Sequence, residues 1–190
     1  MMNYKELISR YRDYLSRVVS RKDEVSDFVT FLDNETDWLE SPASTRFHMS
    51  VEHGLLYHSV GVTTALLDIA KHLDQNISEE TCIVAGLFHD VGKVGYPGKP
   101  YYLKNRFQLN QNYKKPYIIN NDIVAMAHGV RSLYLVTQFV TLTPEEAQAI
   151  VYHDGPYIDG YRDIAMKEEP LTLLLHFADL WHATQYEKDD

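Results

Sequence analysis

Apolar residues recur at helical spacing along most of the chain, and this pattern predicts a mainly helical fold. The clearest run is residues 54–73, where apolar residues from Leu55 to Leu73 recur at steps of three, four and seven. The same periodicity predicts helices over residues 4–19 and 25–39. It returns over residues 123–140 and 170–185, so helices are expected in both halves of the sequence.

Two further helices are marked by polar residues at their expected starts. Ser78 and the two glutamates after it predict a cap and an acidic first turn for a helix through Phe88. Glycines within residues 91–95 are expected to end that helix. Residues 143–146 read Thr-Pro-Glu-Glu, in which the threonine can cap, the proline suits the first helical position and the last glutamate can close a capping box. That helix is expected to end near residues 153–156.

The stretch between residues 96 and 121 lacks helical periodicity and contains two strand-like runs. Residues 101–103 and 117–119 are rich in Tyr, Leu and Ile, and they flank a middle rich in Asn and Gln. A short β-hairpin or lid is therefore expected around residues 101–119. The predicted fold class is all-α, with this hairpin as its β excursion.

Length and composition favour one packed domain. The chain has 190 residues, of which 45% are hydrophobic, which suits a single core and is too short for two ordinary domains. We expect one domain over residues 1–190, with N-terminal helices over residues 4–39 and a core over residues 50–185.

The sequence contains no signal for a membrane or for export. No run approaches the roughly 20 apolar residues that a membrane-spanning helix needs, and the start of the chain lacks the apolar core of a signal peptide. A cytoplasmic location without a membrane partner is expected. Cys82 is the single cysteine, so neither an internal disulfide nor a cluster of thiolate ligands can form. Any metal ion must be held by histidine and carboxylate.

The charge of the chain is unevenly distributed. A net charge of −9 argues against broad affinity for nucleic acid. From Val91 to Asn121, however, there is no Asp or Glu, and the stretch is basic. One interpretation is a lip that attracts phosphate, and the other is a solvated loop that lacks acids; the pattern does not choose between them. The basic residues are Lys93, Lys99, Lys104, Arg106, Lys114 and Lys115.

Three polar sites interrupt helices that are otherwise apolar. His89-Asp90 ends the helix predicted before residue 91, and a charged Asp there is costly to bury unless it is paired or binds metal. On its own this dipeptide is explained better by a histidine that caps a helix end. His58 shares the apolar face of its helix, and Asp179 lies within the apolar run 173–181. Three such sites on three helices indicate that they meet at one ion.

The motifs around these residues resemble the HD superfamily of metal-dependent phosphohydrolases. The resemblance rests on Gly54-Leu55-Leu56-Tyr57-His58-Ser59, on His89-Asp90-Val91-Gly92-Lys93 and on Ala178-Asp179. It implies an all-α helical bundle of the HD-domain type. It also implies that one metal ion is held by His58, His89, Asp90 and Asp179. The chain departs from the pattern at His53, where many relatives have a second glycine.

Two more histidines bear on the number of ions. Superfamily members with two metals use additional histidines between the His-Asp pair and the last Asp, and His128 and His153 lie in that interval. The helix His128-Gly129-x-x-Ser132 and the later His-x-Gly also resemble a phage and Gram-positive subgroup. The resemblance implies that His128 and His153 bind a second ion, with Asp90 as the bridge. The alternative is that both make only local hydrogen bonds at helix ends.

The resemblance implies hydrolysis of a phosphate ester or nucleotide by water that one or two divalent ions activate. A donor set without sulfur suits Mn, Fe, Mg, Ni, Co or Zn. Asp90 and Lys93 are the candidate catalytic residues, and Lys93 and Arg131 are the candidate substrate contacts. The expected partner is a small phosphorylated or nucleotide substrate. Two alternatives stay open: a nuclease for single-stranded RNA or DNA, and a metal or nucleotide sensor without catalytic activity.

Overall fold

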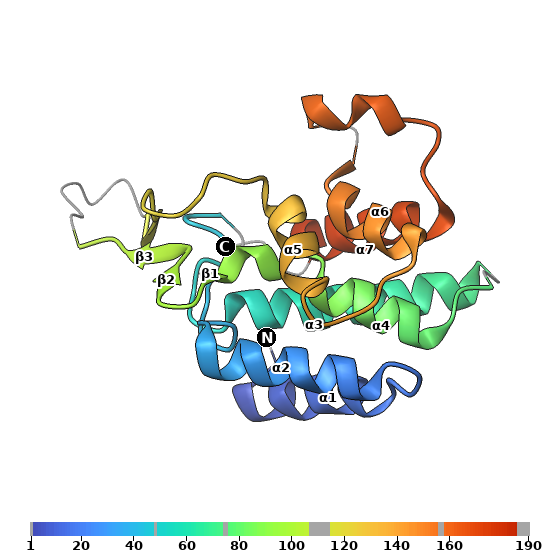
Figure 1. Cartoon of the computed structure of the whole chain (residues 1–190), viewed down its shortest axis with the longest axis horizontal. Coiled ribbons are helices and arrows are strands. Elements are labelled where there is room, and N and C mark those ends of the chain that lie inside the picture. Colours follow the sequence, from blue (N-terminus) through green and yellow to red (C-terminus); the bar gives the residue numbers. More distant parts are fainter. Residues whose placement is uncertain (1, 48, 74–75, 107–114, 156–157, 186–190) are drawn as a thin grey trace.

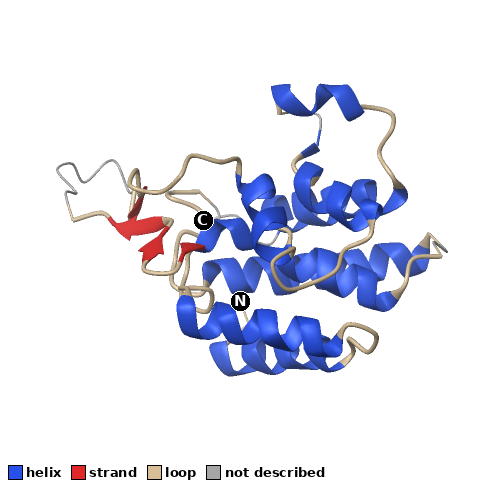
Figure 2. Cartoon of the chain, viewed as in Figure 1, coloured by secondary structure: helices blue, strands red, loops and turns tan. Residues whose placement is uncertain are grey.

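Helices make up most of the part of the chain that the structure describes. The computed structural model describes residues 2–47, 49–73, 76–106, 115–155 and 158–185 (Figure 1). The α-helices in these ranges are α1 (Tyr4–Ser16), α2 (Lys22–Glu35), α3 (Gly54–His72), α4 (Glu79–Phe88), α5 (His128–Val136), α6 (Pro144–Tyr152) and α7 (Pro170–Gln185). The 3₁₀ turns η1 (Val91–Val94) and η3 (Asp159–Ile164) follow α4 and precede α7 (Figure 2). The predicted all-α class is confirmed.

The predicted helix starts at Ser78 and Thr143 are confirmed in detail. The Ser78 side chain accepts a hydrogen bond from the amide of Thr81. Thr143 accepts from the amide of Glu146, whose own side chain accepts from the Thr143 amide, so the capping box is complete. These caps satisfy amides that the first helical turn leaves without partners.

The helix expected over residues 123–140 is shorter than its periodicity predicts. It begins only at His128 and ends at Val136. The carbonyls of Val124 and Met126 accept hydrogen bonds from the guanidinium of Arg131 at 3.4 and 3.0 Å. These carbonyls therefore bond to a side chain instead of to helical amides, and the chain stays irregular before α5.

Two small antiparallel sheets lie beside the helices, drawn in red in Figure 2. Strand β3 (Tyr102–Lys104) pairs with β4 (Tyr117–Ile119), which confirms the expected hairpin at both of its arms. Its middle, including Lys114, lies outside the described residues. The second sheet, in which β1 (Gly95–Tyr96) pairs with β2 (Lys99–Pro100), was not predicted. The signal was Pro97-Gly98, since Gly98 has the positive φ of 68° that a tight turn after proline requires.

Helices α3 and α4 form the middle of the molecule, because they contribute to both apolar clusters of the core. The first cluster joins them to α1 and α2, and the second joins them to α6 and α7. In Figure 1, α1 and α2 lie on one side of α3 and α4, and α5 to α7 lie on the other. Helix α4 is buried from Cys82 through Phe88, so its sequence is apolar all round.

His53 gives α3 an unusual start. Its φ of 66° is left-handed, a conformation that favours glycine, which explains why glycine suits this position. Two contacts hold the histidine there instead. Its Nδ1 donates to the carbonyl of Leu39 at 2.5 Å, and its ring stacks on Tyr4 with 4.1 Å between centroids.

A buried ion network ties three helix ends together. Both terminal nitrogens of the Arg21 guanidinium donate to the Glu146 carboxylate, at 2.7 and 2.8 Å, and Nε donates to Glu80 at 2.9 Å. The other oxygen of Glu80 accepts from the amides of Val19 and Ser20. The network therefore joins the loop after α1 to the first turns of α4 and α6. Among the described helices, none is long and apolar enough to cross a bilayer.

We expect Arg21→Ala to destabilise the fold markedly. The Glu146 side chain is 0% exposed, so removing its cation leaves a buried carboxylate without charge compensation. Breaking a buried pair in this way costs about 3 kcal/mol of unfolding free energy. Urea unfolding followed by circular dichroism measures the loss, with the exposed Arg10→Ala on α1 as the control. A difference between the two variants below about 0.5 kcal/mol would contradict the role of the network.

Candidate metal centre

Six polar residues singled out in the sequence converge at one place, although they come from five helices. Four of them are at most 1% exposed, and the side chains of the other two, on α5 and α7, are 27% and 19% exposed. The six are His58 on α3, His89 and Asp90 after α4, His128 at the start of α5, His153 after α6 and Asp179 on α7.

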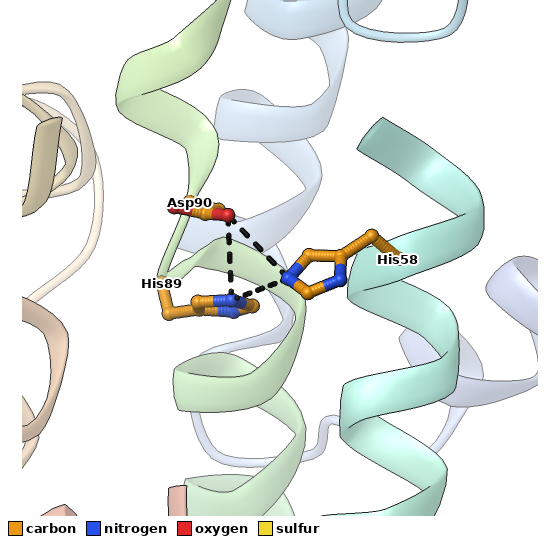
Figure 3. Close-up of side chains that lie close together, drawn as sticks. All are labelled: His58, His89 and Asp90. Atoms are coloured by element: carbon orange, nitrogen blue, oxygen red, sulfur yellow. Dashed lines mark hydrogen bonds and ion pairs between the residues drawn. The ribbon is translucent and has the colours of Figure 1, made fainter. Parts of the chain in front are cut away.

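The first half of the cluster joins α3, the end of α4 and α7. Figure 3 shows His58 reaching from α3 toward His89 and Asp90. Its Nε2 lies 3.3 Å from Nε2 of His89 and 3.5 Å from Oδ2 of Asp90. The same nitrogen lies 3.0 Å from Oδ1 of Asp179. Four side chains from three segments that are distant in sequence therefore present donor atoms to a common space.

The second half joins α5 and the end of α6 to the same Asp90. Nε2 of His128 and Nε2 of His153 lie 3.3 Å apart. They lie 3.6 and 3.4 Å from Oδ1 of Asp90. The two oxygens of Asp90 thus face different partners: Oδ2 faces the histidines of α3 and α4, and Oδ1 faces those of α5 and α6.

The ends of α4 and α6 have the same local geometry. His89 follows α4 and donates from Nδ1 to the carbonyl of Gly86 at 2.8 Å. His153 follows α6 and donates from Nδ1 to the carbonyl of Ile150, also at 2.8 Å. In each case the local bond places a hydrogen on Nδ1 and turns Nε2 toward the cluster. The helix-end hydrogen bond and a role in the cluster are therefore compatible.

Asp154, which was not among the predicted site residues, completes this half. Its Oδ2 lies 3.0 Å from Nε2 of His128, and its side chain is 26% exposed. A signal was present, because His153-Asp154 at the end of α6 repeats His89-Asp90 at the end of α4. The periodicity of α6 alone could not show that this second pair points at the first.

Burial and charge set the protonation of the cluster. Burial lowers the pKa of His89 to about 3, so this ring is neutral. Burial opposes a charge on His153 as well, but the nearby Asp90 raises its pKa to about 9. The pKa of Asp90 is held well below its usual range, since Lys93 and the histidines outweigh its burial. The pKa values of Asp154 and Asp179 are lowered too, so three carboxylates are ionised here.

The two candidate substrate contacts lie in different surroundings. Nζ of Lys93 is 2.6 Å from Oδ2 of Asp90, and its side chain is 15% exposed. Burial opposes its charge, but Asp90 raises the pKa of Lys93 above its usual range. Arg131 is 1% exposed and lies against the Tyr101 ring, with 4.7 Å between its guanidinium carbon and the ring centroid. It donates to backbone carbonyls, including that of Gly92. These bonds use both terminal nitrogens, whereas Nε is buried and has no hydrogen-bond partner among the described residues.

The basic stretch is less positive in the fold than in the sequence. Lys104 and Arg106 line a cavity of about 500 Å³ beside the β3–β4 hairpin. The same cavity is also lined by Asp37, Glu40 and Glu52. Because acids from distant segments offset these bases, the structure favours a solvated hairpin over a continuous phosphate-attracting lip.

The residues present fit a divalent cation. Oδ1 of Asp90 is buried and accepts no hydrogen bond from the described residues, a costly state for a carboxylate oxygen. The donor atoms also form three groups. Within each group they lie within 4.8 Å of one another, and each group combines imidazole nitrogen with carboxylate oxygen. A cation would satisfy the orphaned oxygen and separate the closely spaced nitrogens. The groups are His58, His89 and Asp90; His89, His153 and Asp179; and Asp90, His128 and His153.

Comparison with known proteins supports the same conclusion. Residues 55–186 match the model of the HD domain, which is more than half of the chain. No curated protein and no solved structure shows significant similarity to the chain. The matched range begins on α3 and includes every residue of the cluster. The chain therefore belongs to the HD domain family, whose members are generally metal-dependent phosphohydrolases.

Proposed function

We propose that this protein hydrolyses a small phosphate ester or nucleotide with two divalent cations bound at the cluster. The observation that carries the proposal is the placement of Asp90, whose two oxygens face two separate histidine pairs. A carboxylate that bridges two ions is typical of sites that cleave phosphate esters with water. The net charge of −9 supports a small substrate over a nucleic acid strand.

Each half of the cluster would hold one ion. We assign His58, His89, Asp90 and Asp179 to the first, and Asp90, His128, His153 and Asp154 to the second. Mn, Fe, Mg, Ni, Co and Zn all suit such nitrogen and oxygen donors. Bound ions supply a lowered pKa for water and a positive charge for the phosphoryl oxygens.

The chain itself controls orientation and access. Four of the donors are buried: His58, His89, Asp90 and His153. The side chains of His128, Asp154 and Asp179, by contrast, are 27%, 26% and 19% exposed. Substrate therefore approaches past these three. Lys93 keeps its proton beside Asp90, so it offers a fixed positive charge to a phosphoryl oxygen.

The proposal is tested by hydrolysis with a panel of phosphorylated compounds. With Mn²⁺ present, we expect turnover of bis(p-nitrophenyl) phosphate or of a nucleotide. Asp90→Asn should lower kcat/KM by about 10³-fold or more, or about 4 kcal/mol of activation free energy, because neither ion keeps its shared ligand. The control is Asp68→Asn, an exposed change on α3. Turnover that survives Asp90→Asn would refute the assignment. The panel includes a single-stranded oligonucleotide, and its cleavage would identify a nuclease.

Lys93→Gln tests the positioned charge separately from the ions. We expect kcat/KM to fall by about 10²-fold, as when one stabilising donor is removed from an active site. Bound Mn²⁺, counted by equilibrium dialysis, should stay at the wild-type number because Lys93 is not a ligand. Lys93→Arg keeps the charge and should recover part of the rate. Loss of Mn²⁺ from Lys93→Gln would instead assign Lys93 to the stability of the site.

Asp154→Asn tests the ligand that the sequence analysis missed. Asp154 contacts His128 and not His58. Its loss should therefore lower the affinity for one ion about tenfold or more and leave the affinity for the other unchanged. Mn²⁺ titration by calorimetry measures both affinities. The control is Asp163→Asn, an acid on η3. Unchanged binding of both ions would remove Asp154 from the site.

A further inference from the structure

The two halves of the metal cluster sit on separate elements, so something must fix their spacing. His89 and Asp90 directly follow α4, and His128 begins α5, with 37 residues of sequence between Asp90 and His128. The gap between Nε2 of His128 and Oδ1 of Asp90 is 3.6 Å. A bridging role for Asp90 requires that α5 be held at this distance from the turn after α4.

Gly92, two residues after Asp90, is where α5 meets this turn. Its amide donates to Oγ of Ser132 at 2.8 Å, and its carbonyl accepts from Nη1 of Arg131 at 3.0 Å. Both backbone groups of one residue are thus bound by two consecutive side chains of α5. Ser132 is 0% exposed and Arg131 is 1% exposed, so water does not compete for these bonds.

The contact is close because residue 92 is glycine. A Cβ at this position would lie 2.3 Å from the carbonyl oxygen of His128 and 2.7 Å from the amide nitrogen of Ser132. The backbone of His128 itself therefore rests on Gly92. The position of this histidine beside Asp90 depends directly on the contact.

Arg131 also fixes the chain that leads into α5. Its other terminal nitrogen donates to the carbonyl of Met126 at 3.0 Å, two residues before His128. The ring of Tyr101, next to strand β3, covers the guanidinium. One buried cation therefore connects the turn after α4, the start of α5 and the hairpin.

We propose that Arg131 and Ser132 are positioning residues, which set the distance between the two ion sites by clamping Gly92. This inference rests on the proposed two-ion site. It gives Arg131 a role other than the predicted substrate contact, because both of its terminal nitrogens donate to backbone carbonyls. The clamp acts on the ion held by His128, whereas His58 and Asp179 lie on helices that it does not touch.

The test is Mn²⁺ binding by Ser132→Ala, with calorimetry for affinity and electron paramagnetic resonance for coupling between the ions. We expect one of the two Mn²⁺ affinities, that of the half that contains His128, to fall about tenfold, the usual effect of removing a group that supports a metal ligand. The other affinity should change by less than about twofold. At two equivalents, the spectrum should shift from a coupled pair toward isolated Mn²⁺. Arg131→Lys, which keeps the charge and one donor direction, should show a smaller shift of the same kind.

Two controls separate positioning from stability. Val130→Ala changes an exposed residue of α5 and should bind both ions as the wild type does. Arg21→Ala destabilises the fold away from the cluster. At a temperature where this variant is still folded, it should also bind both ions as the wild type does. If Ser132→Ala lowers the affinity for both ions equally, or changes neither affinity, the proposed clamp is wrong. Wild-type protein that binds one Mn²⁺ only would refute the two-ion function itself, and the clamp with it.

Discussion

The charge of Asp90 is the constraint on which the rest of the structure depends. A carboxylate that is 1% exposed must be compensated, and here the compensation comes from α3, α5, α6 and the turn after α4. Each of these elements must therefore bring a side chain to one point. The apolar packing of α3 and α4 holds the two central helices, but packing is tolerant of small shifts and charge compensation is much less so.

Most of the helical framework could be predicted, because its signals are local. The caps at Ser78 and Thr143 and the apolar face of α3 are each readable within a few residues. The start of α5 could not be predicted in this way. Its position depends on Arg131, whose guanidinium bonds to carbonyls that periodicity would assign to a helix. In the sequence, an arginine that is buried against backbone carbonyls looks the same as an exposed arginine on a helix.

The residues of the candidate site could likewise be predicted where their signals are local, and not where they depend on how helices are placed. His58, His89, Asp90 and Asp179 could be proposed from their motifs, and the fold brings them together. Asp154 was missed because its relevance depends on how α6 is placed against α5. The basic residues beside the hairpin were ambiguous for the same reason, since the acids that offset them come from residues 37–52. Sequence shows which residues are unusual for their surroundings, and tertiary structure decides which of these meet.

The repeated geometry at the ends of α4 and α6 has an electrostatic consequence. His89 and His153 each stand directly after the last turn of a helix, where the aligned peptide dipoles leave about half an elementary negative charge. Two such ends converge on the same few ångströms, beside carboxylates that are already ionised. The backbone therefore makes this point of the molecule attractive to cations before any side chain is counted. A substitution that frayed either helix end would weaken that attraction while leaving every ligand in the sequence.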